Sequence, residues 1–136
     1  MATYTKFQPF VENLAEKVFN LGSDTLKVAL TNSAPVNTYS QLSSVTEISY
    51  TNLSTRAITT SSSAQSSGTY KLVLTDLVLT SSGGTTGPFR YVVIYDDTAT
   101  NDELIAYFDY GSSLTLQDGD TFTLDFDGTN GLLQIA

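Results

Sequence analysis

The strongest pattern in this chain lies between residues 89 and 110 and reads FRYVVIYDDTATNDELIAYFDY. Successive side chains in its first part would point to opposite faces of a strand, and both faces are largely apolar. One face would carry Phe89, Tyr91, Val93 and Tyr95, and the other Arg90, Val92 and Ile94. A strand that is apolar on both faces belongs in the middle of a sheet. The run DDTATND consists of turn formers, so residues 103–110 are predicted to form another strand.

Period-two patterns also precede this central strand. Residues 25–30 alternate apolar and polar side chains and predict a strand that ends in the turn formers TNSAPVNT. Residues 36–55 fit a long loop with a short helix or strand. A short strand at 56–60, a serine-rich turn at 61–68 and a long strand at 70–80 predict a hairpin. The run SSGGTTGP then predicts a flexible connection.

The last part of the sequence continues the alternation of strands and turns. LQDGD is a turn signal, and in the strand TFTLDFD the side chains of Phe122, Leu124 and Phe126 share one face. DGTNG turns again into LLQIA. About seven or eight short strands predict a mainly β fold. We expect an antiparallel β-sandwich or jelly-roll-like barrel with one N-terminal amphipathic helix.

The predicted helix lies before the first strand. Its apolar side chains recur every three or four residues and are Phe7, Phe10, Val11, Leu14, Val18 and Leu21. Pro9 suits a first helical turn and Gly22 suits a stop. We expect this stripe to pack on the protein's own sheet, the alternative being a helix that binds a partner. Residues 1–136 are predicted to be a single domain, with a helical region at 1–22 and the sandwich at 23–136.

Composition excludes several classes of chemistry. The chain contains no histidine and no cysteine, which rules out disulfides, thiolate metal sites and Ser-His-Asp or Cys-His catalysis within it. It contains 21 threonines and 16 serines, and threonine favours pleated strands. We therefore predict no enzyme, no catalytic residues, no cofactor and no cofactor-binding residues.

Charge and hydropathy restrict the partners. The net charge is -8, and residues 96–136 hold nine acids and no base. Because acidic surfaces repel phosphate, we expect no nucleic acid partner. The first residues lack the pattern of a signal peptide, and no run approaches the roughly 20 apolar residues of a membrane span. We expect a soluble protein with no membrane partner, made in a cytoplasm.

Two groups of acidic residues offer candidate sites beside simpler interpretations. One comprises Asp118, Asp120, Asp125, Asp127 and Asn130, whose oxygens are ligands that Ca²⁺ prefers. The other comprises Asp96, Asp97, Asp102, Glu103 and Asp109, which supply carboxylate pairs of the kind used by glycoside hydrolases. Aspartates also form turns and protect sheet edges, and we favour those roles, so no metal ligand is predicted.

Arg90 lies within the predicted central strand, between two aromatic residues. A guanidinium group in such a place requires a carboxylate or several carbonyl partners. An acid from the last third of the chain is the preferred partner, and an intermolecular ion pair is the alternative.

The order of these segments resembles a known family. An amphipathic helix leads into SDTLKVALTNSAPV, SSGTYKLVLTDLVLTSSGG, GPFRYVVIYDDTATNDELIAYFDYGSSLTLQDGDTFTLDFDG and a short LLQIA tail. Over nearly the whole chain this order is similar to small β-rich virion structural proteins of tailed bacteriophages, of the capsid decoration or cement type. The resemblance implies a component of the particle with no catalytic residues to carry over.

The expected function follows from that resemblance. We expect a capsid decoration or cement protein that forms a dimer or trimer, binds across subunits of the major capsid protein on the capsid exterior of the virion and stabilises the head. It would be made in the host bacterial cytoplasm. The alternatives are a tail or head-fibre component and a carbohydrate-binding module. The aromatic residues considered as contacts are Tyr4, Phe7, Phe10, Tyr39 and Tyr50.

Overall fold

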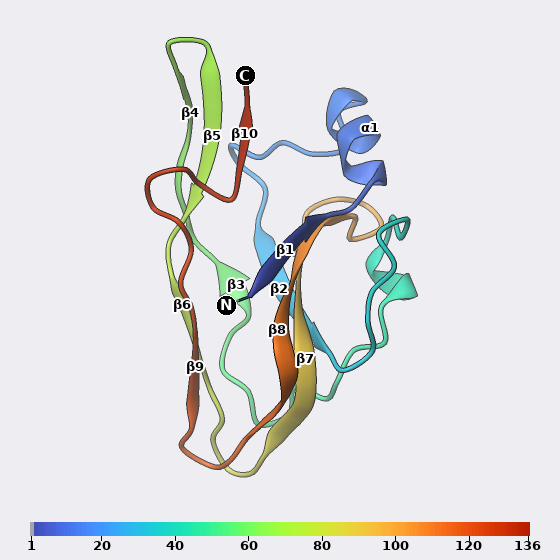
Figure 1. The fold of residues 1–136 in the computed structure, drawn as a ribbon, viewed down its shortest axis with the longest axis vertical. Coiled ribbons are helices and arrows are strands. Elements are labelled where there is room, and N and C mark those ends of the chain that lie inside the picture. Colours follow the sequence, from blue (N-terminus) through green and yellow to red (C-terminus); the bar gives the residue numbers. More distant parts are fainter. Residues whose placement is uncertain (1) are drawn as a thin grey trace.

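The computed structural model describes residues 2–136 and shows a mainly β protein with antiparallel sheets and one α-helix (Figure 1). This confirms the predicted fold class. The elements in chain order are β1 (Thr3–Lys6), α1 (Pro9–Ala15), β2 (Leu26–Thr31), the 3₁₀ helix η1 (Leu42–Ser44), β3 (Ala57–Ile58), β4 (Thr60–Ser66), β5 (Thr69–Leu74), β6 (Leu77–Thr80), β7 (Thr86–Asp96), β8 (Leu104–Leu116), β9 (Thr121–Leu124) and β10 (Leu133–Ile135).

The predicted central strand is central. A five-stranded sheet has the order β1-β8-β7-β2-β3, which places β7 between two long neighbours. Ile94 pairs with Val28 on one side and with Ala106 on the other. Val93 and Ile94 point to opposite faces and are both fully buried. The sheet is therefore covered on both faces, as its sequence requires.

Different parts of the chain cover the two faces of this sheet. One face packs against the strands of two smaller sheets, of order β10-β5-β4 and β6-β9, through residues such as Leu72, Leu79 and Leu124. The other face is covered by Val45 with Tyr39 and Leu42 from the long loop, which includes η1. The pattern of residues 36–55 left open a strand or a helix, and the structure has a loop with one 3₁₀ turn.

The prediction of one long strand at 70–80 is wrong, because the strand is interrupted at Thr75 and Asp76. Its first half pairs with β4 and β10, whereas its second half pairs with β9. At the break, the amide of Thr75 donates to the carbonyl of Thr59 at 2.9 Å. The carboxylate of Asp76 accepts from the amide of Phe126 at 2.8 Å. These bonds let the strand pass from one small sheet to the other.

The predicted serine-rich turn at 61–68 is largely a strand. Residues up to Ser66 pair with β5, and only Ser67 and Gly68, with φ of 52° and 84°, form the turn. Hydroxyl side chains suit an exposed strand as well as a loop, so composition could not separate the two. Figure 1 shows the resulting β4–β5 hairpin extending to one end of the molecule, with the C-terminus beside it.

The helix is shorter than predicted, and the region 1–22 is not all helical. Phe7 belongs to the β1 pairing, because its amide donates to the carbonyl of Ile105 at 3.1 Å and its ring is fully buried. Val11 is 51% exposed, so it does not belong to a buried stripe. After α1 the chain turns at Lys17, whose φ is 68°, and Phe19 packs on Phe10 with ring centroids 5.2 Å apart. Over residues 2–136, no helix has the length and apolar character needed to span a membrane.

Candidate functional site

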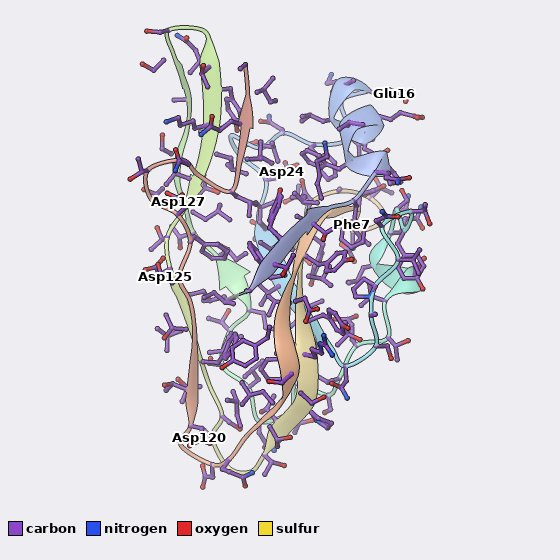
Figure 2. All side chains as sticks on the ribbon, viewed as in Figure 1. Phe7, Glu16, Asp24, Asp120, Asp125 and Asp127 are labelled. Carbon is purple, nitrogen blue, oxygen red and sulfur yellow. The ribbon has the colours of Figure 1, made fainter. Side chains whose placement is uncertain are left out.

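The residues considered as a calcium site do not come together. Asp120 and Asp125 lie at opposite ends of β9, as Figure 2 shows. The carboxylate of Asp127 accepts from the amides of Thr129 and Asn130, both at 2.8 Å, and these bonds lower the pKa of Asp127. Within the described part of the chain, no three acidic side chains gather in a way that could hold a metal ion. The carboxylates of Asp120 and Asp127 instead accept from backbone amides of their own turns.

The second acidic group is not uniformly solvated. Asp96 is fully buried and Glu103 is 7% exposed, so the predicted role of protecting a sheet edge is wrong for these two. They lie at the ends of β7 and β8, where the chain reverses through residues 97–102. Asp97 is more exposed and forms an ion pair with Lys27, at 3.2 Å between Oδ2 and Nζ. The reversal therefore places carboxyl groups inside the protein as well as on its surface.

Only one of the two oxygens of the buried Asp96 carboxyl accepts hydrogen bonds from the backbone. Its Oδ1 accepts from the amide of Thr98 at 2.9 Å and from the amide of Ala99 at 3.1 Å. Its Oδ2 is buried and has no donor among the described residues. The carboxyl of Asp24 lies beside that of Asp96. Burial first, and then Asp24, raise the pKa of Asp96 to about 7.

This arrangement joins two parts of the chain that are distant in sequence. Asp24 lies in the loop before β2, and its Oδ2 accepts from the amide of Asn20 at 2.8 Å. Asp96 ends β7. A second carboxyl group nearby disfavours the negative charge of Asp96, and this effect adds to that of its burial.

A cavity of about 550 Å³ lies beside this pair, between the two loops. Among its lining residues are Lys17, Asn20, Asp24, Asn101 and Glu103. The Glu103 carboxylate accepts from the Asn101 amide at 3.2 Å and from its side-chain nitrogen at 3.3 Å. These contacts hold the reversal in shape.

Arg90 has the internal partner that was preferred from sequence. Its Nε donates to Oδ1 of Asp109 at 2.8 Å and its Nη2 donates to Oδ2 at 3.1 Å. This bidentate pair lowers the pKa of Asp109. The guanidinium group is 5.3 Å from the ring centroid of Tyr91. The ion pair joins neighbouring strands β7 and β8 near the surface.

One concave surface of the protein is mainly apolar. A groove of about 650 Å³ lies between β8 and β9, and we call it the β8–β9 groove. Its apolar lining includes Phe108, Tyr110, Phe122, Leu124 and Phe126. The rings of Tyr110 and Phe122 meet edge to face with centroids 5.4 Å apart, and Tyr110 is 46% exposed. Sequence analysis missed this groove because its two walls come from strands whose relative position no local pattern reports.

Most of the aromatic residues considered as contacts are internal. Phe7 and Phe10 are buried in the two hydrophobic clusters, and Tyr39 packs against the second of these. The Tyr50 hydroxyl is bonded within the protein. Tyr4 is 40% exposed and packs against Phe108, with ring centroids 5.3 Å apart and the ring planes tilted by 60°. Among the five aromatic residues considered as contacts, Tyr4 therefore lies next to the β8–β9 groove, because Phe108 lines that groove.

Comparison with known proteins adds no family. No protein-family model matches the chain, and searches among curated proteins and among solved structures returned no match.

Proposed function

We propose that this chain is a structural protein of a tailed-phage particle. Its role is that of a capsid decoration or cement protein, which binds across major capsid subunits and stabilises the head. The resemblance in segment order supports this role, and the observation that carries it is the β8–β9 groove. An apolar groove with exposed aromatic rings at its rim has the character of a surface that buries a partner's side chains.

The chemistry of the groove defines the partner surface that would fit it. Its floor and walls are aromatic and aliphatic, so an apolar side chain of the capsid protein would enter between Tyr110 and Leu124. Asp125 lies at the groove, and residues 96–136 carry nine acids and no base. A partner with basic residues around its apolar contact would therefore be favoured by electrostatic complementarity.

The proposed role also has consequences for the oligomeric state and the location of the protein. A cement protein acts as several copies on a closed shell, and we propose that this chain forms a homo-oligomer, a dimer or trimer, on the capsid exterior. It would be made in the host cytoplasm and added to assembled heads. Neither membrane nor nucleic acid is part of the proposed mechanism.

Virions provide the direct test. Particles purified from the phage that encodes this chain are analysed by quantitative mass spectrometry, with and without the gene. We expect a copy number that scales with the major capsid protein, and earlier release of DNA on heating when the gene is deleted. A few copies per particle would instead indicate a tail or head-fibre component. Absence from the particle would overturn the proposal.

The groove is tested by binding to heads that lack the protein. Tyr110→Asp places a charge at the rim of the groove, and we expect at least about tenfold weaker binding. Val36→Asp is the matched control, since Val36 is 47% exposed and lies outside the groove. Equal binding by both variants would show that the groove is not the docking site.

A further inference from the structure

The outer edge of β4 is long and uncharged. β4 ends the three-stranded sheet, and within residues 2–136 the main chain of Ser61–Ser66 bonds to β5 alone. No charged residue and no proline occurs from Ile58 to Tyr70. Proteins usually protect an exposed edge with charge, proline or a very short strand, and β4 has seven residues without the first two. Its one irregularity lies at its start, between Thr60 and Ser62.

The other sheet edges are protected. β1, β3 and β10 are four, two and three residues long, and β1 ends in Lys6. β9 is flanked by Asp120 and Asp125. β6 is covered by Ser54, whose amide donates to the carbonyl of Thr80 at 3.0 Å and whose hydroxyl accepts from the amide of Thr80 at 2.9 Å. β4 is thus the edge best able to accept another strand.

The turn of the hairpin identifies the groups that point outward. Ser67 and Gly68 both have positive φ, which is the geometry of a two-residue type I′ turn. In such a hairpin the flanking pair, Ser66 and Thr69, exchanges both ladder hydrogen bonds. Bonded and unbonded pairs then alternate, so Ser63 and Gln65 direct their N–H and C=O groups away from β5.

We propose that β4 pairs antiparallel with β4 of a second copy of this chain, joining two three-stranded sheets into one six-stranded sheet. This deepens the homo-oligomer of the proposed function and rests on it for its biological setting. An edge that pairs antiparallel with itself forms a closed two-fold interface. With the axis near Ser63, Ser62 lies opposite Ala64 of the partner subunit.

Charge favours a second copy at this edge. Each chain carries a net charge of -8, so most surfaces of two copies repel one another. The β4 edge brings no carboxylate to the contact, and its exposed side chains at Ser62, Ala64 and Ser66 are small. Strand pairing of this size forms a weak dimer in dilute solution, and it strengthens when a shell holds copies side by side.

The first test is sedimentation velocity over a concentration series that extends to the millimolar range. The native chain is expected to shift from monomer towards dimer as concentration rises. The double variant Ser62→Lys with Ala64→Lys places like charges opposite each other across the axis, and we expect about tenfold weaker dimerisation. A native chain that stays monomeric throughout would overturn the proposal.

A charge-swap variant makes the test specific to this pairing. Ser62→Glu with Ala64→Glu is also expected to dimerise weakly alone, whereas an equal mixture with the lysine variant should restore the dimer. Ser44→Lys with Thr46→Lys is the matched control, because both positions are exposed and lie far from β4 in the sequence. This control should dimerise more readily than the lysine variant of β4. Failure of the mixture to associate would place the interface elsewhere.

Hydrogen exchange gives a second measure that is independent of mass. The amides of Ser63 and Gln65 should become protected as the native chain is concentrated, while those of the lysine variant stay fast. None of these experiments uses phage particles. A dimer with no binding to heads would therefore defeat the proposed function alone, and binding to heads without a β4 dimer would defeat this inference alone.

Discussion

The carboxyl group of Asp24 lies beside that of Asp96 and raises the pKa of Asp96, although 71 residues separate them in the sequence. Asp96 is fully buried, and its second oxygen has no donor within residues 2–136. Burial and the nearby Asp24 both disfavour the charged form of Asp96, so the stability of the fold is linked to pH.

The first prediction concerns stability as pH rises. The folded pKa of Asp96, about 7, lies above its ordinary value of 3.8, so the folded state binds the proton more tightly than the unfolded state does. Its contribution is fully present below about pH 4 and is lost as pH rises towards 7. We expect the free energy of unfolding to fall by on the order of 2–3 kcal/mol across this window. Urea denaturation at a series of pH values measures it.

The variant Asp96→Asn isolates this group. An asparagine retains an oxygen that can accept from Thr98 and Ala99 and carries no charge at any pH. The variant should match the native protein below about pH 4 and exceed its stability by on the order of 2 kcal/mol at pH 8. Asp97→Asn, at an exposed ion pair, is the control. Parallel pH profiles for Asp96→Asn and the native chain would contradict the assignment.

A second prediction concerns the hydroxyl of Tyr50. It accepts from the amide of Leu30 at 2.9 Å and donates to Glu47 at 2.7 Å, which satisfies an amide on the outer side of β2. Tyr50→Phe leaves this amide without an acceptor and should cost about 1–3 kcal/mol in chemical denaturation. Tyr39→Phe is the comparison, because no hydrogen bond from that hydroxyl occurs within the described residues, and it should cost less. Equal costs would mean that water replaces the Tyr50 hydroxyl.

A third prediction tests the contact between the layers of the sandwich. Phe89 of β7 is fully buried and meets Phe122 of β9 edge to face, with centroids 5.4 Å apart. Phe89→Ala removes this contact and leaves a cavity, so we expect a loss of about 3–5 kcal/mol of stability. Val78→Ala, at a residue that is 52% exposed, should change it by less than about 0.5 kcal/mol. Thermal or urea unfolding of both variants provides the measurement.

A fourth prediction concerns Gly131, which holds β10 close to β5. Its φ is 79°, and an added Cβ would lie 2.5 Å from the carbonyl oxygen of Leu72. Gly119 has a similar φ of 89° with open space around it, which makes it a matched control for backbone strain. Gly119→Ala should cost about 1–2 kcal/mol, and Gly131→Ala should cost clearly more. A similar loss in both would show that the β5 backbone moves aside without penalty.

Local patterns were sufficient for much of the fold. The two apolar faces of residues 89–95 predicted a central strand, and β7 is central because only a sheet interior can bury Val93 and Ile94 at once. The alternation of residues 25–30 predicted β2, and the aspartate-rich runs predicted turns. These features depend on side chains within a few residues of one another, and such spacing is written directly in the sequence.

Tertiary structure decided the features on which the functional argument depends. Asp24 meets Asp96, β8 forms a groove with β9, and the predicted strand at 70–80 divides between two sheets. Each of these three features depends on how segments that are distant in the sequence pair and cross. The pattern of a single strand indicates which of its faces is apolar, but it does not indicate which segment covers that face. The pKa of Asp96 is raised because packing buries this carboxyl and places Asp24 beside it. The groove between β8 and β9 likewise exists only after the sheets have packed.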